Sequence, residues 1–368
     1  MIHSYVRNPK LKLFKMKKIK LFLIFLVSSL ILAAQDKPAT EQAQNKDKPD
    51  KKSVIFGNIY TDFYYAFNDN LKPKAAFEFS TGLLGFTHKF SDKVQATLIY
   101  DVTRTTSNIT VTDSASNSLD VTYFEGSKYT AFLKMGAIEW KITDALELSV
   151  GQLLNQQYLT VQDKFWGFRY IATTYQERYK YGMPADFGAR LTYNFKDQLK
   201  YSITISNGEG PFCYQDDGAN FLYAGNLEIF PSKNIILKLY IDYETISNTA
   251  SAGDKMLVSC FTGYKTEKFM LGIEFIAIDN YKFIKAKQVY GFSLYSYYTL
   301  NSKLKALVRA DYGDLYPELK NQKYINDKQY YIVGFQYEPE KNLFTSLNFR
   351  YQNYPDVPFV YANFGVKF

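Results

Sequence analysis

The 368-residue chain is poor in cysteine and histidine, and no long apolar run occurs beyond its first 34 residues. Its two cysteines, Cys213 and Cys260, cannot form a disulfide framework or a thiolate metal cluster. One of the two histidines, His3, lies near the start, so His88 alone remains in the body of the chain, which excludes a multi-histidine metal site. A transmembrane helix needs about 18 apolar residues in a row, and the body of the chain has no such stretch. We expect neither a metal nor a cofactor.

Once residues 1–53 are set aside, the chain has no excess of positive or of negative charge. The whole chain holds 44 basic and 36 acidic residues, with an isoelectric point near 9.0. Residues 1–34 carry seven basic residues and no acidic one, and residues 35–53 carry five basic and four acidic residues. The remaining segment, 54–368, holds 32 of each, so its net charge gives no reason to expect a nucleic-acid partner.

Residues 1–34 have the parts of a secretory signal peptide: lysines, then a short apolar core, then small residues. An uncleaved signal anchor is the alternative, and Met16 is an alternative start to Met1. Residues 35–53 contain no aromatic and no large aliphatic residue, so they cannot bury enough apolar area to offset the entropy of ordering. We expect this segment to be a disordered periplasmic linker.

Aromatic residues and a strict alternation dominate the rest of the chain, which contains most of the 33 tyrosines and 30 phenylalanines. In one segment, Leu199, Tyr201 and Ile203 alternate with lysine, serine and threonine. The same alternation fills 94–102, 235–243, 304–312 and 360–368. A period of two predicts strands with one apolar and one polar face.

Short and long connections alternate between these strands. Short turns are expected near 91–93, 143–144, 196–198, 231–234, 265–268, 301–303 and 339–342. Longer connections are expected near 67–75, 104–129, 157–185, 207–220, 247–254, 279–287, 313–328 and 353–357. This order predicts an all-β fold over 54–368, an antiparallel up-and-down barrel of about 16 strands, with 14 or 18 as alternatives.

A soluble sandwich would show the same alternation, so the choice between it and a membrane barrel depends on other features. The signal peptide directs the chain out of the cytoplasm. Aromatic residues also stand close to the short turns, where a membrane barrel has an aromatic girdle. These residues are Phe90, Phe195, Phe230, Tyr264, Tyr298 and Tyr337. We therefore predict a transmembrane β-barrel with its short turns on the periplasmic side.

Two sets of residues resemble known outer-membrane proteins. The ending Tyr361-Ala362-Asn363-Phe364-Gly365-Val366-Lys367-Phe368 is similar to the closing strand of outer-membrane porins. Gly151-Gln152, Trp166-Gly167-Phe168-Arg169, Asp186-Phe187-Gly188 and Asn207-Gly208-Glu209-Gly210 resemble the middle of phosphate-selective-porin-like proteins.

The resemblance implies a Gram-negative outer-membrane porin in contact with outer-membrane lipid, open to passive diffusion of small hydrophilic solutes or ions. It also implies recognition of Phe368 by the barrel-insertion machinery, and a homotrimer. Phosphate selectivity is not implied, because the chain shows no dense lysine and arginine ladder.

The polar phase of the strands should face the lumen, because a charge facing lipid at the bilayer midplane costs about 2–4 kcal/mol. The expected lumen-lining cations are Arg190, Lys238, Lys305, Arg309 and Arg350, and the anions are Asp101, Glu147, Asp242, Glu274 and Asp311. The alternative is that these residues pair across strands and only line a wet wall.

The third long connection, 157–185, mixes aromatic and charged residues: Asp163, Lys164, Trp166, Arg169, Tyr170, Glu177, Arg178 and Lys180. A loop of this length is functional or disordered, and this one is too aromatic to be disordered. The hypothesis is that it folds into the barrel and narrows the pore, with Arg169, Arg178 and Lys180 favouring anions. The alternative is an external loop that packs on its neighbours.

Enzymatic function finds little support in the sequence. A barrel hydrolase needs a histidine near the outer rim, whereas His88 precedes a short turn and so belongs to the periplasmic end. We expect a channel and not an enzyme. A non-conducting structural or adhesive barrel and a lipid-active barrel enzyme remain as alternatives.

Overall fold

The computed structural model describes residues 52–69, 71, 73–104, 107–112, 118–123, 129–246, 252–315, 328–353 and 356–368. The predicted signal peptide, 1–34, and residues 35–51 of the predicted linker lie outside these residues. Ser53, predicted as the end of the linker, is the first strand residue.

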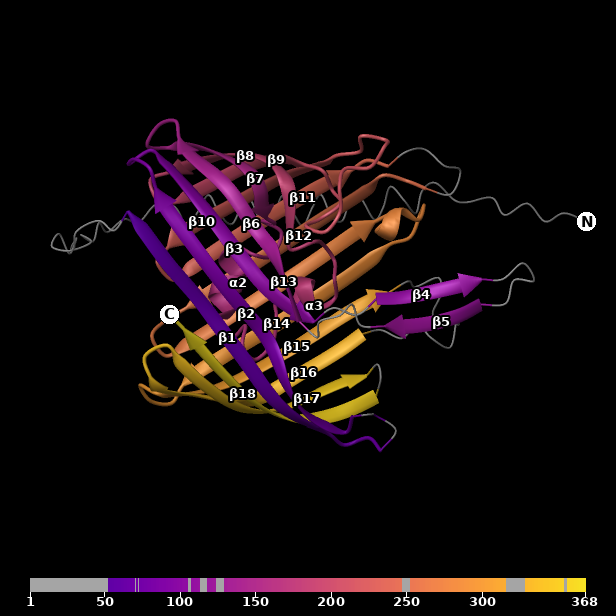
Figure 1. Cartoon of the computed structure of the whole chain (residues 1–368). Helices are drawn as coiled ribbons and strands as arrows, with labels where there is room; N and C mark the ends of the chain where they lie inside the picture. The colour runs from indigo at the N-terminus through magenta and orange to yellow at the C-terminus, as the bar shows by residue number, and fades with distance from the viewer. Residues whose placement is uncertain are drawn as a thin grey trace, which may run out of the picture. The chain divides into compact units, whose positions relative to one another are not determined.

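Within the described part of the chain, 16 strands close into one antiparallel barrel and two more form a separate hairpin (Figure 1). The barrel strands are β1 Ser53–Ala66, β2 Ala75–Lys89, β3 Val94–Arg104, β6 Tyr129–Lys141, β7 Leu146–Leu154, β8 Ala185–Phe195, β9 Leu199–Ser206, β10 Leu222–Ser232, β11 Ile235–Glu244, β12 Lys255–Lys265, β13 Phe269–Asp279, β14 Val289–Thr299, β15 Leu304–Leu315, β16 Lys328–Glu340, β17 Leu343–Asn353 and β18 Asp356–Lys367. The hairpin is β4 Ser107–Thr112 and β5 Ser118–Tyr123, and the short helices are α2 Val161–Trp166, α3 Tyr175–Arg178 and η1 Tyr281–Phe283.

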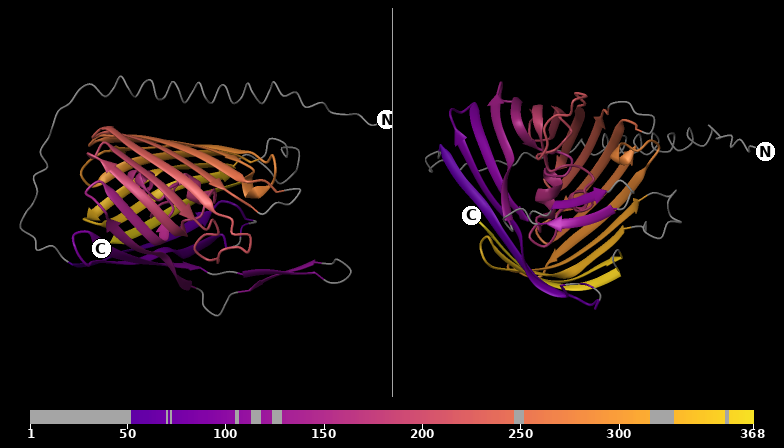
Figure 2. Two further views of the ribbon diagram at one scale, coloured as in Figure 1. Left: turned by 90° about the horizontal axis from the view of Figure 1, so that it is seen from above. Right: turned by 45° about the vertical axis from the view of Figure 1, so that its right-hand side comes forward.

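The first and last strands close the ring. The pairing of β1 with β18 runs from Asn58 opposite Lys367 to Ala66 opposite Phe359. Neighbouring strands are consecutive in the sequence, except that β3 pairs with β6 across the hairpin, and they are tilted around the barrel (Figure 2). The predicted all-β, up-and-down barrel of 16 strands is confirmed.

The predicted alternation of connections is confirmed, with one exception. All seven predicted short turns are present, and each joins its strands through two to four residues. The predicted long connection at 353–357 is wrong: β17 and β18 are separated only by residues 354–355, because Asn353 already pairs with Asp356.

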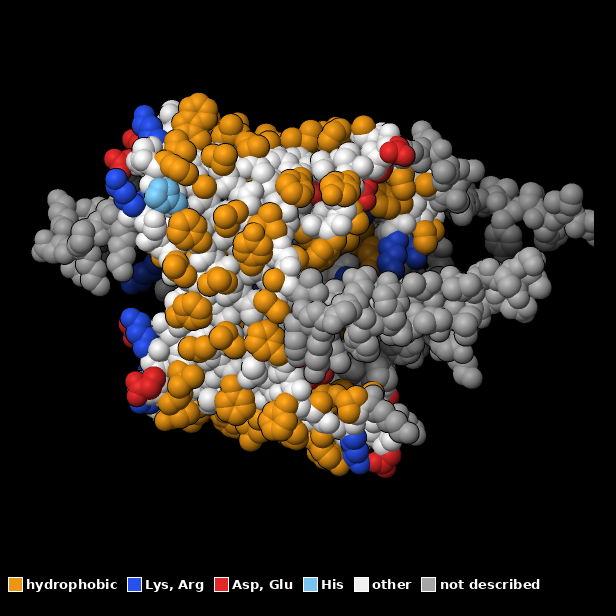
Figure 3. Space-filling view, in the orientation of Figure 1, with side chains coloured by type: hydrophobic (Ala, Val, Ile, Leu, Met, Phe, Trp, Pro, Cys, Tyr) orange, Lys and Arg blue, Asp and Glu red, His pale blue; other side chains and the backbone are white. Residues whose placement is uncertain are grey.

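The two faces of each strand differ as the alternation predicts. On β9, Tyr201 and Ile203 are exposed on the outside, whereas Ser202 and Thr204 are buried on the inside. Hydrophobic side chains cover the middle of the visible surface, and charged side chains gather toward its two ends (Figure 3). An apolar band between polar rims is the surface that a membrane barrel presents to lipid.

The predicted aromatic girdle is largely confirmed. Five of its six residues are exposed next to a short turn: Phe90, Phe195, Tyr264, Tyr298 and Tyr337. The sixth, Phe230, is half-buried. No helix in the described part of the chain is long and apolar enough to cross a bilayer.

The cost of a charge on the outer face should depend on its depth. Ile203 is 53% exposed in the middle of β9, and we expect Ile203→Arg to destabilise the folded barrel by about 2–4 kcal/mol. Phe195→Arg, in the girdle, is the matched control and should cost about 0–1 kcal/mol. Urea titration of the protein folded in lipid vesicles measures both. Equal costs would contradict a lipid-facing role for β9.

Candidate channel interior

Residues 155–184, between β7 and β8, contain most of the predicted loop and are called the inner segment here. The segment is folded: α2 ends at Gly167, whose φ of 70° gives the left-handed C-cap that favours glycine. Its aromatic residues Tyr158, Trp166 and Tyr175 are at most 1% exposed. Figure 1 shows both α2 and α3 within the ring of strands. The segment therefore packs inside the barrel.

Aromatic contacts attach the inner segment to several strands. Ring centroids lie 5.3 Å apart for Phe165 and Phe261 of β12, and 5.1 Å apart for Trp166 and Tyr295 of β14. Tyr170 lies between Tyr60 of β1, at 6.2 Å, and Phe344 of β17, at 5.6 Å. Contacts this close are favourable beyond the area that they bury. These ring contacts attach the segment to β1, β12, β14 and β17.

Glycine in the wall permits this close approach at β14. A Cβ at Gly291 would overlap the hydroxyl of Tyr175, which donates a 3.0 Å hydrogen bond to the carbonyl of Tyr312. The absence of a side chain thus leaves room for a ring that reaches the backbone of the next strand.

Buried charges of the wall hold the inner segment. The ammonium of Lys238, on β11, donates to the carbonyl of Gln157 at 3.0 Å and to the hydroxyl of Thr160 at 2.8 Å. It also donates to the backbone carbonyl of Gln156 and the side-chain oxygen of Gln162. Lys238 is only 5% exposed, so these oxygen atoms replace water around its charge.

A second attachment comes from β13 and β15. The guanidinium of Arg309 binds Asp311 at 2.8 Å and donates to the carbonyl of Thr173 at 2.6 Å. The amide of Gln176 donates to Glu274 at 3.1 Å. Lys238, Glu274, Arg309 and Asp311 were expected to line open lumen; they point inward, but the inner segment covers them.

The predicted residues of the segment divide into paired and exposed groups. Arg169 lies between Asp163, at 2.7 Å, and Glu177, at 2.5 Å. Burial lowers the pKa of Arg169, but the two carboxylates outweigh this effect and the pKa lies above its ordinary value. Arg178 stacks on the ring of Tyr330 at 3.5 Å.

Arg169 is thus neutralised by its own segment, which contradicts the expectation that it would attract anions. Lys164 and Lys180 are the predicted cations of the segment that remain exposed.

The other predicted lumen residues also lie on the inner face. Asp101 pairs with Lys134 of β6 at 2.5 Å, and Arg350 stacks on Tyr361 at 3.6 Å. Glu147, Arg190 and Lys305 are half-buried, and Asp242 is 2% exposed. None of the ten predicted residues, all of which are described, is exposed on the lipid face.

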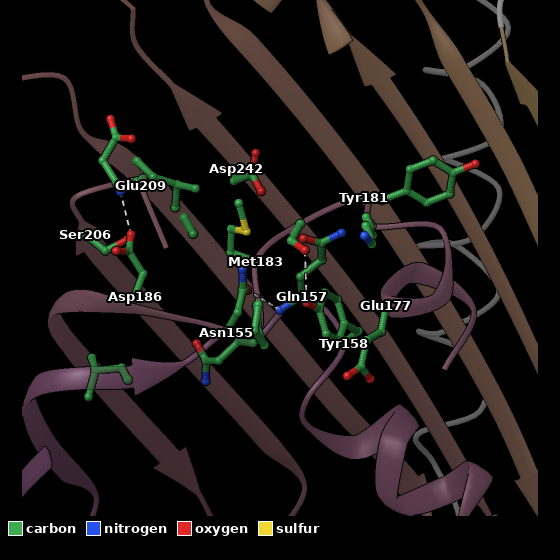
Figure 4. Close-up of a pocket in the computed structure, with 18 of the residues that line it drawn as sticks. Asn155, Gln157, Tyr158, Glu177, Tyr181, Met183, Asp186, Ser206, Glu209 and Asp242 are labelled. Carbon is green, nitrogen blue, oxygen red and sulfur yellow. Dashed lines mark hydrogen bonds between the residues drawn. The ribbon is translucent and has the colours of Figure 1, made fainter. Parts of the chain in front are cut away.

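A cavity of about 970 Å³ lies between the inner segment and the wall near the ends of the strands that carry the long connections. Gln157, Tyr158 and Tyr181 line it from the segment, and Asp186 and Asp242 line it from the strands (Figure 4). Charges of both signs face the same space.

Several charged residues of this cavity were missed from the sequence. Lys134 was missed because a bulge opposite Ile99 and Tyr100 shifts the phase of β6 at that point. Glu244 and Lys255, which form an ion pair, lie at strand ends where alternation gives no signal. In the described part of the chain, no cluster of three or more histidine, cysteine, aspartate or glutamate residues could hold a metal ion.

Three solved structures share this fold. OmpF of Salmonella typhi, in complex with daunomycin, has a TM-score of 0.62 and 10% identity, covering 86% of this chain and 97% of that one. The anion-selective porin of Comamonas acidovorans has a TM-score of 0.58 and 10% identity, covering 86% and 99%. The trimer form of OmpT, an outer membrane protein of Vibrio cholerae, has a TM-score of 0.52 and 8% identity, covering 86% and 99%. At these identities the likeness shows the fold alone.

No protein of curated function matches the chain in sequence. A family model does match it: "Putative beta-barrel porin-2, OmpL-like", over residues 179–366, which is 188 of the 368 residues. Since the match covers more than half of the sequence and the fold is the barrel that such a family requires, the chain belongs to the OmpL-like beta-barrel porin-2 family.

Proposed function

We propose that this porin is a passive channel of the outer membrane for small hydrophilic solutes and ions. The observation that carries the proposal is the charge-lined cavity inside a barrel whose outer face is apolar. A barrel of 16 strands is too wide to be filled by its own side chains, so its interior holds water unless another part of the chain fills it.

The inner segment fills only part of that interior. It packs on β1 and on β11 to β18, and Ser202 of β9 donates to Gln156 at its start, whereas β2, β3 and β6 face the cavity with Thr81, Asp101 and Lys134. We infer that solutes pass on this uncovered side and that the segment sets the width of the passage. A constriction made by a loop lets pore size and local charge determine selectivity.

The charge balance supports weak ion selectivity. Asp101 with Lys134, and Glu244 with Lys255, are ion pairs that face the cavity. Paired charges contribute little field at a distance. Lys164 and Lys180 of the inner segment are exposed, and they provide the remaining bias toward anions.

Location and assembly follow from the same proposal. The apolar band would contact outer-membrane lipid after export by the signal peptide. Phe368, which exchanges 3.0 Å backbone hydrogen bonds with Gly57, would present the terminal aromatic to the insertion machinery. A homotrimer is proposed because a protein of similar fold is described in a trimer form.

An enzymatic role has less support. His88 accepts or donates a 2.8 Å hydrogen bond with Ser53, but its ring stands beside Phe86 and Phe90 in the outward aromatic band. His88 therefore lies at the short-turn end of the barrel, away from the cavity, where an aromatic ring suits the membrane–water interface.

Deleting residues 163–180 should widen the passage. The ends of the deletion stay close, because Tyr158 donates a 3.0 Å hydrogen bond to the carbonyl of Gly182. We expect single-channel conductance in planar bilayers to rise about two-fold or more, since a wider constriction conducts more. A heat-dependent gel shift serves as the control that the barrel has folded. Unchanged conductance would show that the segment does not limit the passage, and no conductance from the intact protein would refute the channel.

Removing the two exposed cations of the inner segment should change ion preference. In a potassium chloride gradient, we expect the reversal potential of Lys164→Gln with Lys180→Gln to move toward cation preference, because the acidic groups at the passage then outnumber the basic ones. Lys341→Gln, exposed in a short turn, is the control and should leave the potential unchanged. If the double variant keeps the wild-type potential, the segment does not set the ion preference.

A further inference from the structure

Four residues that lie side by side on four neighbouring strands form a row that faces the cavity. Arg190 of β8 pairs in register with Thr204 of β9, Thr204 with Ala224 of β10, and Ala224 with Asp242 of β11. All four line the cavity. The row therefore has a cation at one end, an anion at the other, and two small residues between them.

Neither end of the row forms an ion pair with another described residue. Among the described residues, Arg190 forms no ion pair; it donates to Thr204 at 3.1 Å and to the carbonyl of Leu154 at 2.7 Å. Asp242 is 2% exposed, forms no ion pair with any described residue, and has a carboxylate oxygen with no hydrogen-bond partner. Lys255 acts electrostatically on Asp242, but its ion pair is with Glu244.

A charge without an ion-pair partner is unfavourable where water is excluded, and on this wall Asp242 is buried and Arg190 is half-buried. The two do not neutralise each other, because strands β9 and β10 separate them. Elsewhere in the interior, charges such as Lys238 and Arg309 have full sets of partners within the chain. The row thus differs from those sites: neither of its charges has an ion pair, and one carboxylate oxygen of Asp242 is left for a solute to bind.

The spacing of the row limits the size of such a partner. The guanidinium of Arg190 is hydrogen-bonded to Thr204 of β9. The guanidinium therefore lies two strand spacings, about 10 Å, from β11. Two hydrogen bonds of about 2.9 Å each leave roughly 4 Å between the charged groups of a ligand that bridges the row. The small side chain of Ala224 leaves the middle of the row open.

We propose that this row is a subsite for small zwitterions, with the carboxylate of the solute on Arg190 and its ammonium on Asp242. The solute class is that of α-amino acids, whose charges are separated by one carbon atom. A solute with one charge satisfies only one end of the row, and a neutral solute satisfies neither. This inference rests on the proposed channel function, of which it specifies the substrate class.

Liposome swelling with two solutes of nearly equal shape tests the subsite. L-Alanine is zwitterionic and lactamide is its neutral counterpart. With the wild-type protein, alanine should enter several-fold faster than lactamide, and its rate should saturate as its concentration rises. Equal rates for the two solutes would overturn the subsite while leaving the channel intact. If neither solute enters and bilayers show no conductance, the channel itself fails.

Variants separate the two ends of the row. Asp242→Asn keeps the shape of the side chain and should reduce the rate of alanine to that of lactamide, while moving the reversal potential toward anions because Arg190 remains. Arg190→Gln should abolish the same advantage with the opposite shift. Asp92→Asn, an identical change in an exposed short turn, should keep the preference for alanine. Retention of the preference in Asp242→Asn, with the folded gel shift intact, would overturn the proposal.

Discussion

The closure of β1 on β18 is the constraint on which the rest of the structure depends. In hydrocarbon, a backbone N–H or C=O without a partner costs several kcal/mol, so an open sheet edge cannot face lipid. The exchange of backbone hydrogen bonds between Gly57 and Phe368 extends the pairing to the last residue of the chain. Because the ring is closed, every strand residue faces either lipid or the interior. Side chains that face lipid must be apolar, whereas those that face the interior can be polar or charged.

The interior of the barrel and the inner segment depend on each other. Irregular backbone such as residues 155–160 leaves carbonyl groups that need donors, and Lys238 supplies three hydrogens to the oxygen atoms there. In turn, Lys238 and Arg309 could not remain buried and charged without those oxygen atoms. The charges of β11 and β15 are therefore part of the same folded unit as the segment, although more than 50 residues separate them in the sequence.

The sequence predicts the barrel well because its signal is local. Alternation with period two assigns the strands, the short turns and the inward phase, and all ten predicted lumen residues avoid the lipid face. The alternation does not show which distant residues are in contact. From the alternation alone, Glu274 and Lys238 cannot be distinguished from residues that line an open lumen. Only the folded structure shows that the inner segment covers them. Lys134 is hidden by a bulge, and Arg169 is predicted free because its pairing with Asp163 and Glu177 depends on how the segment folds.

The same separation of faces explains how a chain about 10% identical to solved porins keeps their fold. The outer face requires only apolar side chains at alternate positions, and the ladder requires only backbone atoms, so neither fixes particular residues. The interior, by contrast, depends on specific partners. Residues 54–368 contain as many basic as acidic residues, and most of the buried ones are paired or hydrogen-bonded within the chain. A net charge of zero therefore does not mean a uniform interior, and in the proposed subsite it is the few groups without an ion pair that would determine which solutes the channel distinguishes.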